Sequence, residues 1–134
     1  MNMFTFHHLG VAVRALQTAI PIYETLFDYK VVNGPLDDPI QNVSACFLSR
    51  GAGDTVIELV APFGPDSPIH GTLKRGGGAY HVCYQVPDIG AAISFLTDQG
   101  SFLLSGPVPA VAFEMREIAW LVTETNLLVE LLQA

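Results

Sequence analysis

The sequence predicts an α+β fold made of two tandem βαβββ modules that form one curved mixed sheet around a central metal cleft. The first observation is a repeat of polar residues within apolar runs: His81 lies 73 positions after His8, and Glu130 lies 72 positions after Glu58. The second is that strand-like and helix-like periodicities follow one another in the same order in both halves. Neither half has enough chain to cover its own sheet, so the two sheets are expected to join.

In the first half, a helix is expected between strands. Apolar residues recur at helical spacing over residues 15–28, and Pro21 should kink this helix or lie near its first turn. Turn-rich stretches such as NGPLDDP and RGAGD separate the strand candidates that follow. The predicted strands are 4–13, 29–33, 43–49 and 54–61.

The second half repeats this order after a segment rich in proline and glycine. Asp88 is a suitable N-cap for a helix over 88–99, and Gly100 is a suitable stop. A short helix is expected at Ser67–Leu73, within the connecting segment. The predicted strands are 80–86, 101–105, 112–122 and 127–133. Residues 1–134 are therefore interpreted as a single domain with a first module at 1–61, a linker at 62–79 and a second module at 80–134.

The composition excludes several classes of partner. Half of the residues are hydrophobic and 14% are charged, which favours a folded chain, and the net charge of −7 argues against nucleic acid or an anionic membrane as partner. The net charge does not exclude a small anionic substrate. There is no signal peptide pattern and no apolar run of about 18 residues, so a cytoplasmic protein with no membrane partner is expected. Cys46 and Cys83 are interpreted as buried thiols.

Strand parity places four ligand-type residues on matching faces, because side chains two apart along a strand share a face. His8 lies with Gly10 and Ala12, and the same rule applies around Glu58, His81 and Glu130. Two imidazoles and two carboxylates that converge would form an octahedral site for a divalent metal, with room for water or substrate.

Each of these residues also has a simpler interpretation. A single histidine in an apolar strand is more often a hydrogen-bonded core residue, and a glutamate can face water from an edge strand. The shared offset favours the metal site. His7 is the local alternative to His8, and the H-x4-V spacing that recurs at His81 selects His8. His70 has no counterpart in the repeat and is expected to be exposed.

Four segments carry a family resemblance: HHLGVAV, IELVAPFGPDSPI, GGGAYHVCYQVPDIGAAI and LLVELLQ. Together with the His-Glu-His-Glu order they resemble the vicinal oxygen chelate (glyoxalase, bleomycin resistance and dioxygenase) superfamily over most of the chain. Within it, the chain is most similar to methylmalonyl-CoA epimerase.

This resemblance implies that His8, Glu58, His81 and Glu130 bind a divalent ion (Co, Ni, Mn, Zn or Mg). It also implies that Glu130 doubles as acid and base, and that the substrate is an acyl-CoA thioester or a related carbonyl compound that is enolised on the metal. Pairing into a homodimer is a further implication.

The sequence departs from the epimerase pattern at two places. Ile40 stands where similar epimerases carry a glutamate, and Asp37 or Asp38 could replace it only from a stretch that is typical of a solvated turn. Residues 106–117 replace a glycine-rich loop, which predicts a reshaped pocket wall.

Three functions follow: a metal-dependent isomerase, which we favour; a lactoylglutathione lyase; and a non-catalytic small-molecule binding protein. A ring-cleaving dioxygenase is disfavoured because such iron sites use two histidines and one carboxylate.

Overall fold

The structure, a computed structural model, describes residues 2–134 and consists of two compact units. The first unit is His8–Tyr80, and the second unit combines the residues up to His7 with His81–Ala134. The division falls within strand β1 (Thr5–Ala12) and within strand β5 (Gly78–Val86). Each unit has its own β-strands, at least one α-helix and its own buried core.

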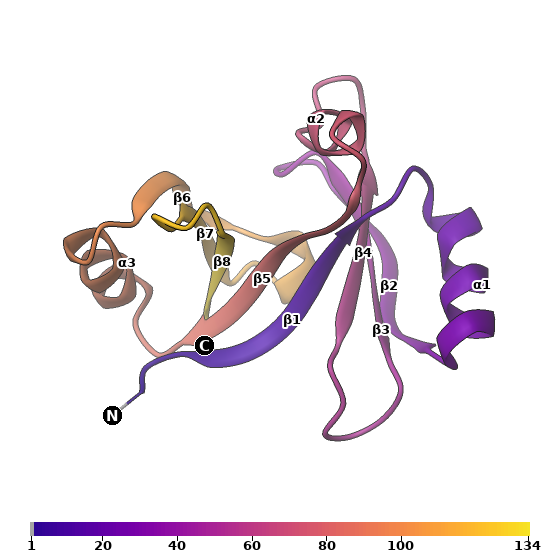
Figure 1. Cartoon of the computed structure of the whole chain (residues 1–134), viewed down its shortest axis with the longest axis horizontal. Helices are drawn as coiled ribbons and strands as arrows, with labels where there is room; N and C mark the ends of the chain where they lie inside the picture. Colours follow the sequence, from indigo (N-terminus) through magenta and orange to yellow (C-terminus); the bar gives the residue numbers. More distant parts are fainter. Residues whose placement is uncertain (1) are drawn as a thin grey trace. The chain divides into compact units, whose positions relative to one another are not determined.

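In the first unit, strand β4 (Ile57–Pro62) lies between β1, with which it is parallel, and β3 (Val43–Ser49), with which it is antiparallel. Strand β2 (Lys30–Asp38) pairs with the outer side of β3. Helix α1 (Leu16–Phe27) lies along this sheet (Figure 1). Its residues at helical spacing pack on a core whose buried members include Val11, Leu16, Ala19, Cys46, Leu48 and Leu59.

Helix α2 (Ile69–Lys74) also belongs to the first unit. Ile69 is buried against Ala12 and Val60, so the helix covers the ends of β1 and β4. The helix expected at Ser67–Leu73 is therefore present, but it begins two residues later. Ser67 precedes the helix and its hydroxyl oxygen accepts the backbone N–H of Ile69 at 3.3 Å.

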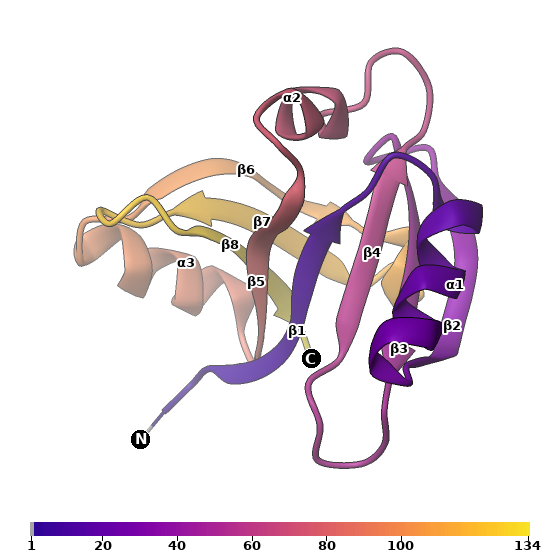
Figure 2. The ribbon, with the colours of Figure 1, turned by 45° about the vertical axis from the view of Figure 1, so that its right-hand side comes forward.

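The second unit repeats this plan with strand β5, helix α3 (Ile89–Asp98), β6 (Phe102–Pro109), β7 (Glu117–Val122) and β8 (Leu128–Gln133), as Figure 2 shows. Strand β8 is parallel to β5 and antiparallel to β7, and β7 pairs with β6. The carboxylate of Asp88 caps α3 by accepting the N–H of Ala91 at 3.0 Å. The α+β class and the two βαβββ modules are confirmed.

The outer strands differ from the sequence prediction. NGPLDD is not a turn, because β2 continues to Asp38, and β6 continues through two prolines to Pro109. The strand expected at 112–122 is wrong in its first part: Val111–Phe113 form a 3₁₀ turn, and the strand begins at Glu117. Register shifts in the β2–β3 and β6–β7 ladders explain how strands at the edge of a ladder accommodate proline, which lacks an N–H donor.

A glycine lies at the same place in both outer strands. Gly34 and Gly106 have φ values of 93° and 94°, and each precedes a proline across a cis peptide bond. A Cβ at Gly34 would lie 2.9 Å from the carbonyl oxygen of Ala45, and one at Gly106 would lie 2.6 Å from that of Ile118. Only glycine allows this close approach between the strands.

Both cysteines are fully buried thiols, as expected. Burial raises the pKa of the Cys46 thiol, and the nearby carboxylate of Glu24 raises it further. Because the thiolate is the reactive form, we expect a disulfide-type thiol reagent to titrate essentially no thiol in the folded protein. Two thiols should react after unfolding in guanidinium chloride. Rapid release of one equivalent from the folded chain would contradict this burial.

Within the described residues, no helix combines the length and apolar character needed to cross a membrane.

Candidate metal centre

His8 and Glu58 form a buried pair in the first unit. The parallel register of β1 and β4 places Gly10 opposite Glu58, so the histidine two residues earlier lies diagonally across from the glutamate on the same face. The Nε2 atom of His8 is 3.1 Å from Oε1 of Glu58, and the two side chains are 0% and 8% exposed. The structure thus brings these two sequence-predicted residues into contact.

His81 and Glu130 form the equivalent pair in the second unit. Cys83 lies opposite Glu130 in the parallel β5–β8 ladder, which is the same two-residue offset from the histidine. The Nε2 atom of His81 is 3.3 Å from Oε1 of Glu130, with side chains 1% and 5% exposed. The same local geometry therefore occurs twice.

The chemistry of these pairs suits a divalent metal. Each unit offers one imidazole nitrogen and one carboxylate oxygen, which are ligands of Zn, Ni, Co and Mn ions. Burying a carboxylate requires a compensating partner, because an unpaired charge loses its hydration. In each unit the imidazole supplies that partner, and a bound cation would satisfy both side chains in the same way.

An aromatic residue stands beside each pair. Phe47 on β3 lies opposite Glu58, and Trp120 on β7 lies opposite Glu130. The ring of Phe47 meets His8 edge-to-face with centroids 5.4 Å apart, and the ring of Trp120 meets His81 in the same way at 4.8 Å. These contacts restrict rotation of the imidazoles.

Phe47 and Trp120 are not among the site residues predicted from the sequence. Their spacing contained the signal, because Trp120 lies 73 positions after Phe47, the same offset that separates the histidines.

The other histidines lie elsewhere in their units. His7 takes the opposite face of β1 from His8, and its ring contacts Phe113 at 5.6 Å between centroids. His70 is exposed, as predicted, with Nε2 3.0 Å from the carbonyl oxygen of Gly64.

The segment around Ile40 does not resemble a freely solvated turn. Ile40 is 45% exposed, whereas Asp38 is only 2% exposed, so the expectation of a solvated Asp38 is wrong. One carboxylate oxygen of Asp38 accepts the N–H groups of Ile40 and Gln41 at 2.9 and 3.0 Å. Asp37 is exposed, as expected, and accepts the hydroxyl of Ser44. Asp38 therefore stabilises this turn through its side chain.

Comparison with known proteins places the chain in a family. Residues 7–132 match the model of the Glyoxalase/Bleomycin resistance protein/Dioxygenase superfamily. The chain is 33% identical over 117 residues to an ethylmalonyl-CoA/methylmalonyl-CoA epimerase of Cereibacter sphaeroides, covering 86% of this chain and 85% of that protein.

Two solved structures are similar over nearly the whole chain. A hypothetical protein of Bacillus halodurans has a TM-score of 0.86 at 28% identity, with coverage of 99% of this chain and 96% of its own. Methylmalonyl-CoA epimerase of Mycobacterium tuberculosis has a TM-score of 0.81 at 25% identity, covering 99% and 90%. The chain therefore belongs to the Glyoxalase/Bleomycin resistance protein/Dioxygenase superfamily, with methylmalonyl-CoA epimerases among its relatives.

Proposed function

We propose that the protein is a metal-dependent isomerase of the methylmalonyl-CoA epimerase type that moves a proton beside the carbonyl of an acyl-CoA thioester. The observation that carries this proposal is the buried His–Glu pair that recurs at one register in both units. The epimerases among the relatives support the choice of substrate class.

We further propose that the two pairs bind one divalent ion together. A single pair supplies two protein ligands, which is few for a tightly held ion. Four ligands would leave two positions of an octahedral site open for water or for substrate oxygens. His8, Glu58, His81 and Glu130 are all almost fully buried, which suits a site from which bulk water is excluded.

The chain's own residues would act as follows. Glu130 takes the α-proton, and its burial keeps the carboxylate poorly hydrated and therefore reactive. His81 is held by Glu130 on one side and by Trp120 on another, which keeps the imidazole aimed at the site. A bound divalent ion would supply Lewis-acid stabilisation of the negative charge that develops on the carbonyl oxygen.

Inversion of the α-carbon needs a second proton carrier, whereas exchange of the α-proton with solvent does not. Ile40, which replaces the family's glutamate, cannot transfer a proton. Glu130 alone can remove the α-proton and return one from the same face. We therefore expect deuterium incorporation into methylmalonyl-CoA in D₂O to be faster than epimerisation, as measured by mass spectrometry and chiral analysis. Equal rates would show that another residue replaces the missing carrier.

Trp120 provides the test of the metal site, because it is the only tryptophan of the chain and contacts His81. Co²⁺ or Ni²⁺ should quench its fluorescence, with saturation at one ion per chain. The His8→Ala substitution, which is in the other unit, should weaken the metal affinity measured by this quenching by at least roughly 10-fold to 100-fold, the loss that removal of an outer-shell partner alone causes. His70→Ala is the matched control and should titrate like the wild type.

Two outcomes would contradict the shared site. Saturation at two ions with unchanged quenching in His8→Ala would mean that each pair binds its own ion. Absence of bound metal after supplementation would remove the metal altogether and favour a non-catalytic binding protein. Formation of lactoylglutathione from the hemithioacetal, without exchange of methylmalonyl-CoA, would identify a lactoylglutathione lyase instead.

The organisation of the chain adds three further proposals. The single domain over 1–134 with its linker at 62–79, the homodimer and the cytoplasmic location all stay predictions. Sedimentation velocity would measure the oligomeric state.

A further inference from the structure

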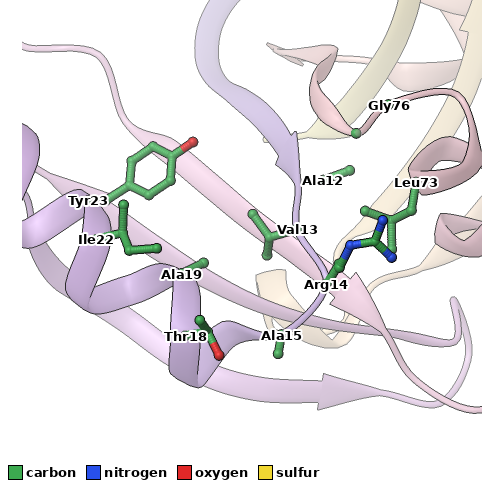
Figure 3. Close-up of a pocket in the computed structure, with 11 residues that line it drawn as sticks. Ala12, Val13, Arg14, Ala15, Thr18, Ala19, Ile22, Tyr23, Leu73 and Gly76 are labelled. Atoms are coloured by element: carbon green, nitrogen blue, oxygen red, sulfur yellow. The ribbon is translucent and has the colours of Figure 1, made fainter.

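A pocket of about 450 Å³ lies in the first unit, and neither His8 nor Glu58 is among the residues that line it. It is bounded by the end of β1, the first two turns of α1 and the turn that follows α2. Figure 3 shows Ile22 and Tyr23 on the α1 side and Arg14 and Leu73 on the other. The volume falls in the range of small-molecule sites, which is roughly 300–1,000 Å³.

Positive charge gathers at this pocket in an acidic protein. The chain has 6 lysines and arginines against 13 acidic residues. Arg14 lines the pocket, and Lys74 and Arg75 lie between the lining residues Leu73 and Gly76. Within residues 2–134, none of these three cations takes part in an ion pair, although Arg50 pairs with Asp54. No acidic residue is among the described residues that line the pocket, so the local potential favours an anion.

The first turn of α1 adds to this potential. Ala15 occupies the N-cap position and no side chain caps the helix, and both Ala15 and Thr18 line the pocket. At the equivalent position of the other module, 73 residues later, Asp88 caps α3 with its carboxylate. The uncapped N–H groups of α1 carry a partial positive charge beside Arg14.

We propose that this pocket binds the phosphate-bearing end of a ligand, and, resting on the proposed function, that this ligand is the coenzyme A portion of the thioester. A guanidinium suits phosphate because it can donate two parallel hydrogen bonds. Ala19, Ile22 and Leu73 offer an apolar wall for the organic part of the ligand. An acidic protein that binds a polyanionic ligand needs such a local cluster of unpaired cations.

Strand β1 links this pocket to the first His–Glu pair. His8 and Ala12 are four residues apart on the same strand, which corresponds to about 13 Å at a rise of about 3.3 Å per residue. An extended pantetheine arm can bridge such a separation, so one ligand could place its thioester near His8 and its phosphates at Arg14.

The test is equilibrium binding of coenzyme A and of adenosine 3′,5′-bisphosphate to the wild type, Arg14→Ala and Arg50→Ala. Arg14→Ala should weaken both ligands by roughly 10-fold to 100-fold, the range expected for loss of a charged hydrogen bond. Pantetheine, which has no phosphate, should bind equally to all three proteins. Arg50→Ala is the matched control and should leave every affinity unchanged. Equal binding of coenzyme A to wild type and Arg14→Ala would overturn the proposal, as would an equal loss in Arg50→Ala.

These results separate the pocket from the proposed reaction. Arg14-dependent binding of adenosine 3′,5′-bisphosphate, without exchange of methylmalonyl-CoA, would support the phosphate site and contradict the epimerase-type function. If the wild type and Arg14→Ala both catalyse exchange of methylmalonyl-CoA with the same KM, the result would support the reaction and overturn the phosphate site.

Discussion

Replacing Glu130 by glutamine should lower deuterium exchange into methylmalonyl-CoA by roughly 100-fold to 10,000-fold, the usual contribution of a positioned acid or base. Glutamine has nearly the same shape, but its amide cannot accept the α-proton. Glu130 is 3% exposed and belongs to β8, which lies between β5 and β7, so the nearly isosteric substitution preserves packing. The exchange rate is measured by mass spectrometry in D₂O, and far-UV circular dichroism checks the fold.

Glu117→Gln is the matched control, because Glu117 is also on a strand of the second unit but is exposed. It should exchange at the wild-type rate. Normal exchange in Glu130→Gln would remove Glu130 from the mechanism. Restored exchange in Glu130→Asp, with a lower rate, would support a carboxylate as the group that transfers the proton.

The Gly106→Ala substitution should lower the free energy of unfolding by about 3 kcal/mol or more, because it combines two costs. A positive φ strains any residue with a Cβ by about 1–3 kcal/mol. The new Cβ would also lie 2.6 Å from the carbonyl oxygen of Ile118, so β6 and β7 must separate. Overpacking of this kind costs about 1–3 kcal/mol. Urea unfolding followed by the fluorescence of Trp120 reports directly on β7, which contains both Ile118 and Trp120.

Gly53→Ala separates the two costs. Gly53 has a comparable φ of 85°, but a Cβ there would meet nothing within 4 Å. It should therefore lose only the conformational part, about 1–3 kcal/mol. Similar losses in both variants would show that the close approach to Ile118 contributes nothing.

Local sequence patterns were sufficient to predict much of the fold. The helical spacing of Leu16, Ala19 and Tyr23 predicted α1, and Asp88 predicted the start of α3. The offsets of 73 between His8 and His81 and of 72 between Glu58 and Glu130 indicated that these four residues act together. Such features depend on residues within a few positions or on a sequence repeat, and both are visible in a linear chain.

Other features depended on pairing between distant segments. The prolines of β2 and β6 are typical of turns, and only register shifts against β3 and β7 allow these segments to remain strands. The burial of Asp38 likewise follows from the folded turn around it and not from its composition.

The sequence by itself determined the fold class, the repeat and the four candidate ligand residues, and the pairing of each histidine with one glutamate came from the strand register. Tertiary structure alone decided that Phe47 and Trp120 lie beside the histidines, that Gly34 and Gly106 touch neighbouring strands, and that Arg14 borders a pocket. The physical reason is that these contacts join residues from separate strands and helices. Their positions depend on strand register and helix packing, which are set by the whole core and are not encoded in any local pattern.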